Sequence, residues 1–323
     1  MRGAAESAAS GGVVAELFEG LSVAPGSVPS LRLMAALHAS VLEGSAGELA
    51  EYYPTPGRAQ PPTGAWHAAS RLLHERSADM RGAVARTVQT NEPGRSVALF
   101  GVLLWLGERF GQPVRLLEIG ASAGLCLIPD HYAYVVSGAR LGDPQAELVF
   151  AEPWVGTPVA NPPAAAEALR VVERAGCDLE PLDLRSEDDH RTALSYIWPD
   201  ELDRMERFRL AADAFVADPV PIDRASADEW LSGRLRIPVE GTLTVIWQSV
   251  VRQYLGEDVK SAVAETIETA GLKATEDAPV AWATMEPTKD HLGEFDVRCT
   301  LWPRGKTASL GPAGNHGPPV RWR

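Results

Sequence analysis

Ten residues in the middle of the chain, LLEIGASAGL at positions 116–125, fit two motifs that imply different chemistry. Gly120, Ser122 and Gly124 form G-x-S-x-G, the turn that presents the nucleophilic serine of serine hydrolases. The same residues with Glu118 form E-x-G-x-x-x-G, a glycine-rich turn that follows the first strand of a sheet binding a nucleotide or S-adenosylmethionine. Ser122 is a nucleophile in the first interpretation and a small loop residue beside a cofactor in the second.

The hydrolase interpretation requires a base and an acid that follow the serine in the chain. His291 and His316 lie downstream of Ser122, and Asp223 or Asp183 could orient either histidine. However, no His-Gly-Gly-Gly segment precedes the motif to form an oxyanion hole. The strand that carries the motif is also expected to be the first of its sheet, whereas several strands precede the serine in α/β-hydrolases. We therefore favour the cofactor loop and keep the hydrolase as an alternative.

The cofactor interpretation assigns a role to each residue of the loop. The Glu118 carboxylate can reach the amino group of an amino-acid moiety, directly or through water. Glycines at 120 and 124 remove side chains where the backbone turns tightly and a ligand approaches. An acid between Leu117 and Ile119 also costs desolvation energy unless something pairs with it. The residues predicted to hold the methionine part of S-adenosylmethionine are Glu118, Gly120, Ala121, Ser122 and Gly124.

Two further acids fit the rest of such a cofactor. An acid at the end of the second strand should accept hydrogen bonds from both ribose hydroxyls. Asp178 in GCDLEP (176–181) is the predicted residue, with Glu173 and Asp183 left as alternatives. Asp223 follows the third expected strand and is predicted to lie on the adenine side. Asp is also favoured at helix caps, which gives Asp223 an equally good structural explanation.

Polar residues on either side of the loop are candidates for the substrate site. QTNEPGR (89–95) places five polar side chains between helical segments, and the planar guanidinium of Arg95 suits a carboxylate or phosphate. Other candidates follow the fourth and fifth expected strands, because ligands of open parallel sheets bind at the carboxyl ends of strands. The predicted substrate-binding residues are Asn91, Glu92, Arg95, Gln248, Ser249 and Tyr254, and the catalytic candidates are Gln248, Tyr254 and Glu286.

Two regions with different patterns must position these residues. Apolar residues at helical spacing predict five helices before residue 111, at Val13–Leu21, Ser30–Leu42, Thr63–Arg76, Ala78–Val88 and Ser96–Phe110. Short apolar strands then alternate with helices at Leu202–Phe215, Ala227–Arg234 and Val259–Ala270, which predicts a mostly parallel sheet. The expected strands are Val114–Ile119, Leu169–Val172, Val220–Ile222, Leu243–Trp247, Val280–Thr284 and Phe295–Trp302, the last one antiparallel.

The predicted domains are therefore a helical region at 1–110, which covers the strand ends, and an α/β domain at 111–323. An insertion at about 128–166 includes an extra hairpin formed by Tyr132–Val136 and Leu148–Phe150. Pro129 is expected to kink the helix that follows the glycine loop.

Composition narrows the possible functions. A formal net charge of −13 without a Lys/Arg cluster disfavours nucleic acid as a partner, since such binding depends on phosphate neutralisation. No apolar run reaches membrane-spanning length, no signal peptide is evident, and a cytoplasmic location is expected. Three scattered cysteines and seven isolated histidines give no metal-ligand spacing, so no metal is predicted.

Several segments together carry a resemblance to a known family. They are LLEIGASAGL, YYPTPG (52–57), VQTNEPGRS (88–96), GCDLEPLDL (176–184), SYIWPDE (195–201), SVVRQYL (249–255) and HGPPVRW (316–322). Over about Tyr52–Trp322 the chain resembles the bacterial domain-of-unknown-function 2332 family. The resemblance implies a Rossmann-like sheet similar to that of class I S-adenosylmethionine-dependent methyltransferases. The family pattern has His at position 248, whereas this chain has Gln248, which cannot take a proton.

The sequence thus predicts a methyltransferase that uses S-adenosylmethionine and acts on a small molecule, with an acidic one as a candidate. The oligomeric state and the identity of the acceptor are left open. Methyl transfer needs mainly alignment of the reacting atoms, so a missing base does not exclude it. A serine hydrolase using Ser122 is the first alternative. A degenerate, non-catalytic methyltransferase-fold binding module is the second, favoured by Gln248 and Pro129.

Overall fold

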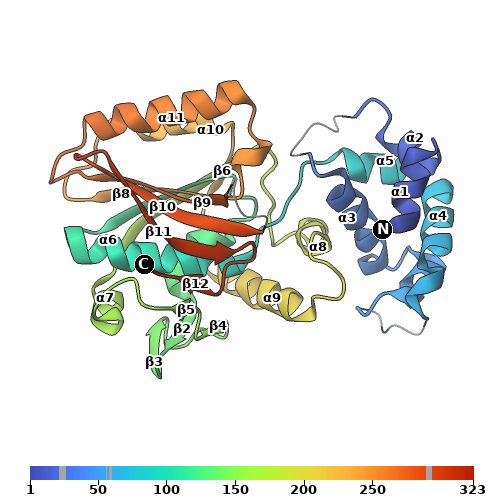
Figure 1. Ribbon diagram of the computed structural model, residues 1–323, viewed down its shortest axis with the longest axis horizontal. Helices are drawn as coiled ribbons and strands as arrows, with labels where there is room; N and C mark the ends of the chain where they lie inside the picture. The colour runs from blue at the N-terminus through green and yellow to red at the C-terminus, as the bar shows by residue number, and fades with distance from the viewer. Residues whose placement is uncertain (22–26, 56, 58–59, 289–292) are drawn as a thin grey trace. The chain divides into compact units, whose positions relative to one another are not determined.

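Two compact units make up the part of the chain that the structure describes. The computed structural model describes residues 1–21, 27–55, 57, 60–288 and 293–323. One unit comprises Met1–Thr90 with Leu182–Glu206, and the other comprises Asn91–Pro181 with Arg207–Arg323. Figure 1 shows the path of the chain and labels its helices and strands. The helix at 96–110 belongs to the second unit, and a later segment, 182–206, returns to the first.

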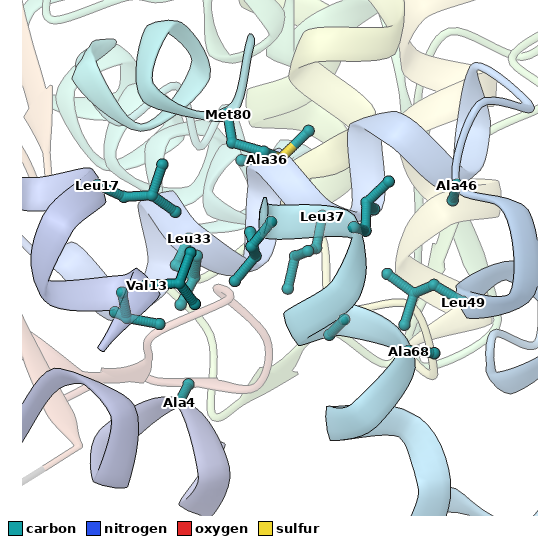
Figure 2. Packing of buried hydrophobic residues seen from close by; sticks show 14 of the residues in the cluster. Ala4, Val13, Leu17, Leu33, Ala36, Leu37, Ala46, Leu49, Ala68 and Met80 are labelled. Carbon is teal, nitrogen blue, oxygen red and sulfur yellow. The ribbon is translucent and has the colours of Figure 1, made fainter. Parts of the chain in front are cut away.

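The first unit is built from helices around an apolar core. Its helices are α1 (Arg2–Ala9), α2 (Val13–Phe18), α3 (Pro29–Leu42), α4 (Ala65–Glu75), α5 (Ser77–Ala85) and α8 (Glu187–Ser195), with short turns η1 (Gly47–Tyr52) and η2 (Pro62–Gly64). Leu33, Leu37 and Val41 recur at four-residue spacing on one side of α3 and are buried. They pack with residues such as Leu17 and Met80, whose side chains converge in Figure 2.

The segment 182–206 is tied to the first unit by a buried histidine. His38 on α3 is fully buried, and its Nδ1 lies 3.2 Å from the carbonyl oxygen of Ser195 and 3.0 Å from that of Ile197. Burial lowers the pKa of His38, so the neutral ring donates its Nδ1 proton to these carbonyls. This bond connects α3 with the end of α8, a helix that the sequence analysis did not predict.

The second unit contains a mixed sheet of seven strands. In spatial order these are β11 (Lys306–Gly314), β10 (Glu294–Trp302), β9 (Val280–Pro287), β8 (Leu243–Ser249), β1 (Val114–Ile119), β6 (Val171–Asp178) and β7 (Ile222–Arg224). The five strands from β9 to β7 are parallel. β10 is antiparallel to β9, as predicted for these two strands. β11, which was not predicted, is antiparallel to β10 and so runs in the direction of β9.

Helices cover both faces of this sheet (Figure 1). Leu117 and Ile119 of β1 pack with α10 (Ala227–Arg234) and α11 (Glu257–Leu272) in one apolar core. Side chains alternate along a strand, so Glu118 leaves β1 on the opposite face, where α6 (Ser96–Phe110) lies. α6 is apolar on all sides, as a helix enclosed by protein should be, and it ends at Gly111 with φ of 63°.

The predicted insertion is present, but its strands pair differently from the prediction. β2 (Ala133–Val136) is antiparallel to β3 (Ala139–Gly142) and parallel to β4 (Val149–Ala151). The expected hairpin between 132–136 and 148–150 is therefore wrong, because the tight turn follows β2 directly at Ser137 and Gly138, both with positive φ. The remaining elements of the unit are α7 (Pro162–Ala168), the pair β5 (Trp154–Val155) and β12 (Val320–Arg321), and α9 (Leu202–Ala217), which crosses the boundary between the units.

The predicted helix after the glycine loop is also absent from the described structure. Two single turns, η4 (Leu125–Leu127) and η5 (Pro129–His131), replace it. A proline disfavours helical backbone in the residue before it, and Ile128 accordingly adopts φ of −117° and ψ of 46°. Pro129 therefore ends the helical backbone instead of kinking it.

Candidate functional site

The residues predicted to carry chemistry lie on the second unit, around the carboxyl ends of its parallel strands. In chain order the strands that run from β7 to β9 are the third, second, first, fourth and fifth of the sheet. The order reverses between β1 and β8, and open α/β sheets bind ligands outside the strand ends at this point. The glycine loop follows β1, and Gln248 and Ser249 end β8. The topology therefore brings the two predicted groups to the same place.

The glycine loop adopts the backbone conformation that its residues predicted. Gly120, Ser122 and Gly124 all have positive φ, at 67°, 52° and 85°. The space beside the two glycines, however, holds protein atoms: a Cβ on Gly120 would lie 2.2 Å from Val251 Cγ2, and one on Gly124 would lie 2.8 Å from Phe215. Backbone conformation and packing thus explain both glycines, and the approach of a ligand to this loop stays a prediction.

Replacing Gly124 by Ala is expected to destabilise the protein by about 3 kcal/mol. A residue with a Cβ in left-handed backbone loses about 1 kcal/mol of stability. The added Cβ also overpacks Phe215 and Ile222, which costs a further ~1–3 kcal/mol. Gly138→Ala is the matched control, because Gly138 has φ of 83° but no atom within 4 Å of a Cβ. Urea unfolding of both variants measures the difference. Equal losses would show that Gly124 is required for its backbone conformation alone.

Side chains from neighbouring segments hold the loop in place. Asn91 Oδ1 accepts a hydrogen bond from the Leu125 amide at 2.9 Å, and the Tyr132 hydroxyl donates to the Leu125 carbonyl at 2.7 Å. Arg174 donates to the Leu127 carbonyl at 2.9 Å and forms a bidentate pair with Asp130. These bonds fix the backbone of Leu125 and Leu127, in the segment that the sequence predicted to be helical.

Glu118 is a buried carboxylate that lacks a full set of partners. It is 2% exposed, and its Oε2 makes no hydrogen bond to the described residues. Its register partner on β8, Trp247, is fully buried and also has an indole N–H without a partner. Register partners lie side by side on one face of the sheet, so an unsatisfied acceptor neighbours an unsatisfied donor. Burial raises the pKa of Glu118 strongly, attraction to Arg95 lowers it, and repulsion from Asp178 raises it.

Arg95 is the cation of this site. It is 8% exposed, and it donates from Nε to the Asn315 carbonyl at 3.2 Å and from Nη1 to the Ser249 carbonyl at 3.4 Å. Its charge stabilises ionised Glu118 and ionised Glu286, yet no described carboxylate lies within ion-pair distance of its guanidinium. The guanidinium therefore retains hydrogen-bonding capacity toward an anionic group.

Asp178 is the last residue of β6, and its carboxylate accepts the Ser122 amide at 2.9 Å and the Glu180 amide at 2.9 Å. Of the two alternatives, Glu173 lies within β6 and pairs with Arg115, and Asp183 belongs to the first unit. Asp178 is thus the acid that contacts the glycine loop.

Asp223 has a structural explanation in the contacts of its carboxylate. Its Oδ2 accepts hydrogen bonds from the Trp230 indole at 2.7 Å and from Arg234 at 2.9 Å, which join β7 to α10. These bonds lower its pKa. Its role toward a cofactor stays a prediction.

Glu92 and His316 bear on the hydrolase alternative. The Glu92 side chain is 1% exposed and accepts hydrogen bonds from the Gly94 amide at 2.9 Å and from Arg207 at 3.1 Å. His316 Nδ1 lies 3.6 Å from Glu92 Oε2 and makes no hydrogen bond to the described residues. His291, the other candidate base, lies outside the described residues. The hydrolase therefore stays an alternative.

Gln248 and Glu286 form a second buried group beyond the glycine loop. Gln248 is 3% exposed and donates from Nε2 to Glu286 Oε1 at 2.9 Å, while its Oε1 accepts the Trp282 indole at 3.1 Å. Glu286 Oε1 also accepts the amides of Val251 and Arg252, both at 3.2 Å. Ser249 contributes its carbonyl to Arg95, and Tyr254 is 40% exposed.

The sequence analysis missed several contributors to this site. Nothing in the local sequence indicates a polar role for Trp247 or Trp282, because both are apolar residues within strands. Their place beside the site follows only from the register of β1, β8 and β9. Arg207 of α9 also escaped notice, because it follows Glu92 at a distance of more than a hundred residues.

The described residues hold no group of three or more potential metal ligands, and Cys126, Cys177 and Cys299 are buried without disulfides. Among the described helices, none has both the length and the apolar character that a membrane crossing requires.

Comparison with known proteins gave one match. A family model described as uncharacterized protein conserved in bacteria (DUF2332) matches residues 1–322. No curated protein and no solved structure matches the chain.

Proposed function

The chain belongs to the bacterial DUF2332 family, and from that premise we propose that it is an S-adenosylmethionine-dependent methyltransferase acting on a small molecule. The observation that carries the proposal is a buried carboxylate at the end of β1, Glu118, whose Oε2 has no partner among the described residues, near a buried cation, Arg95, with which it does not pair. An amino acid carries the complementary pair of charges, an ammonium and a carboxylate.

The proposal extends to the fold. The order of the first five strands is that of doubly wound, Rossmann-like sheets, which bind nucleotides where the strand order reverses. The two antiparallel strands β10 and β11 extend such a sheet on the side of β9.

The residues of the site fit the parts of this cofactor. Glu118 Oε2 accepts from an ammonium group, and Arg95 binds a carboxylate, so Arg95 moves from the substrate site to the cofactor site. Asp178 is the acid for the ribose hydroxyls, because it ends β6 and its carboxylate contacts the glycine loop through the Ser122 amide. S-adenosylmethionine, when bound, supplies an electrophilic methyl group. The chain's own residues then have to bind, orient and exclude water.

Calorimetric titration with three ligands tests the proposal. We expect wild-type protein to bind S-adenosylmethionine and S-adenosylhomocysteine with micromolar Kd. 5′-Methylthioadenosine, which lacks the amino-acid part, should bind at least ~10-fold more weakly, since it forgoes two charge-assisted contacts. Glu118→Gln should weaken the binding of S-adenosylhomocysteine by ~100-fold and leave the affinity for methylthioadenosine nearly unchanged.

The controls separate the three functions. Glu173→Gln removes a carboxylate of the same sheet that already pairs with Arg115, and it should bind all three ligands as wild type does. Failure of wild-type protein to bind any of them at millimolar concentration would refute the methyltransferase proposal. Labelling by a serine-reactive phosphonate that is lost in Ser122→Ala would then favour the hydrolase, and its absence the binding module.

A further inference from the structure

The two oxygens of the Glu286 carboxylate have opposite surroundings. Oε1 accepts three hydrogen bonds, from Gln248 Nε2 at 2.9 Å and from the amides of Val251 and Arg252 at 3.2 Å each. Oε2 is buried and accepts none from the described residues. Three donors on one oxygen fix the orientation of the carboxylate, so Oε2 points to a defined place where no described residue donates to it.

The orientation of Gln248 is fixed in turn. The Trp282 indole can only donate, so the Gln248 atom that it meets at 3.1 Å is the amide oxygen, and the nitrogen must face Glu286. A chain of hydrogen bonds therefore runs from Trp282 through Gln248 to Glu286 and fixes the orientation of the carboxylate.

Backbone strain lies directly beside this carboxylate. Val250 has φ of 56°, which is rare and costly for a β-branched residue. This turn directs the amides of Val251 and Arg252 to Glu286 and places the Val251 side chain against Gly120. Val251 thus contacts both Glu286, through its amide, and Gly120 of the glycine loop, through its side chain. Strain of this kind persists where the surroundings over-determine it, often at ligand sites.

The charges around Glu286 indicate what the free oxygen accepts. Arg95 interacts with it electrostatically but does not pair with it, and the partly exposed Tyr254 also lies within electrostatic range. Burial is the main effect on Glu286 and raises its pKa in spite of its donors. A cationic N–H donor offsets this penalty best, because a charge-assisted bond is about twice as strong as a neutral one. A net charge of −13 favours the approach of cations as well.

We propose that Glu286 Oε2 is the binding site of a protonated amine, and that the acceptor molecule of this protein therefore carries an ammonium group that anchors it there. The ammonium has no lone pair, so the methyl group passes from the sulfonium to another nucleophilic atom of that molecule, and S-adenosylhomocysteine leaves. The second half of this inference rests on the proposed methyltransferase function, whereas the first half does not. The proposal differs from the acidic acceptor expected from Arg95 in the sequence, because Arg95 is assigned to the cofactor. It also gives Glu286 a binding role with no chemical step of its own.

Nuclear magnetic resonance titration of the full-length, ¹⁵N-labelled protein tests the site without any cofactor. The reporters are the Trp282 indole and the Gln248 side-chain amide, both of which are hydrogen-bonded in the chain that ends at Glu286. Methylammonium chloride at pH 8 should shift both signals saturably, with a Kd of millimolar order, the range accessible to so small a ligand. Methanol lacks the charge and tetramethylammonium lacks the N–H, so each should shift them at least ~10-fold less at equal concentration and ionic strength.

Two variants complete the test. Glu286→Gln should abolish the response to methylammonium while it keeps the affinity for S-adenosylhomocysteine within ~3-fold. Glu268→Gln, which removes an exposed carboxylate of α11, should respond as wild type does. Equal responses to methanol or tetramethylammonium, no response to methylammonium, or a full response in Glu286→Gln would each overturn the inference. The selectivity of wild-type protein decides the matter even if Glu286→Gln does not fold. A wild-type protein that binds methylammonium but not S-adenosylhomocysteine would retain the amine site and refute the methyltransferase.

Discussion

Glu118→Gln is expected to raise the thermal stability of the free protein while it removes affinity for S-adenosylhomocysteine. A carboxylate that is 2% exposed and has an unsatisfied oxygen costs desolvation energy that Arg95 offsets only in part. The neutral amide has nearly the same shape and avoids most of this cost. We expect a gain of about 1–2 kcal/mol at pH 8, which raises Tm by roughly 2–8 °C for a unit of this size.

The pH dependence of this gain follows from the direction of the pKa shift. The pKa of Glu118 in the folded protein lies above its value in the unfolded chain, about 4.3, mainly because of burial. Between these two values the folded state binds more protons, so the free energy of unfolding falls as pH rises. The stabilising effect of Glu118→Gln should therefore be largest at pH 8 and vanish near pH 4. Differential scanning fluorimetry across this range measures it.

Glu173→Gln is the control for this experiment. Glu173 lies on the same sheet but pairs with Arg115 at 2.9 Å, so its removal should not stabilise the protein at any pH. A loss of stability in Glu118→Gln at pH 8 would show that the carboxylate is satisfied in solution, for instance by ordered water. The argument for a ligand at this position would then fail.

The sheet shows which strands sequence alone can define. β1 was predicted with its observed bounds, because six consecutive residues are buried between Pro113 and Gly120. The strand predicted at Leu169–Val172 ends six residues before the observed end of β6 at Asp178, since Glu173 and Arg174 interrupt its apolar pattern. Those two charges are tolerated only because Arg115 and Asp130 pair with them, which no local pattern reveals.

Strand β11 was missed for a related reason. Its sequence, KTASLGPAG, contains few residues that favour strands, and Pro312 cannot donate to a ladder. The strand lies at the edge of the sheet, where such a proline is tolerated. Its extended backbone is stabilised by pairing with β10, because its residues have little strand propensity of their own.

The acids of the candidate site were predictable from the sequence, but their surroundings were not. Glu118 stood out because an acid within an apolar strand needs a reason. That its oxygen is unsatisfied, that Trp247 lies beside it and that Val251 covers Gly120 depend on strand register and on a strained turn. Sequence identified the residue types, and only the tertiary structure shows which of their atoms are unused.

Arg95→Met is expected to cause the largest loss of stability, about 3 kcal/mol or more at pH 8. The substitution keeps much of the apolar bulk but leaves two buried carboxylates, Glu118 and Glu286, without a nearby cation. It also removes the hydrogen bonds to the carbonyls of Ser249 and Asn315. Without the cation the pKa of both acids rises further, so the folded state holds its extra protons over a wider pH interval. The free energy of unfolding should then fall more steeply with pH than in wild type.

A double-mutant cycle separates the charge of Arg95 from its hydrogen bonds. If charge dominates, Glu118→Gln should recover about 1–2 kcal/mol in the Arg95→Met background beyond its own effect at pH 8, and little at pH 5, where Glu118 is largely protonated. Arg95→Lys, which keeps the charge but not the planar fork, should lose less stability than Arg95→Met and show the wild-type pH slope. Urea unfolding at both pH values measures the four proteins of the cycle and Arg95→Lys. A loss that is the same at pH 5 and pH 8, with no coupling to Glu118, would mean that Arg95 serves only to tie Ser249 and Asn315 together. The cation would then be a structural tie, and recognition of a zwitterion by this site would lose its physical basis.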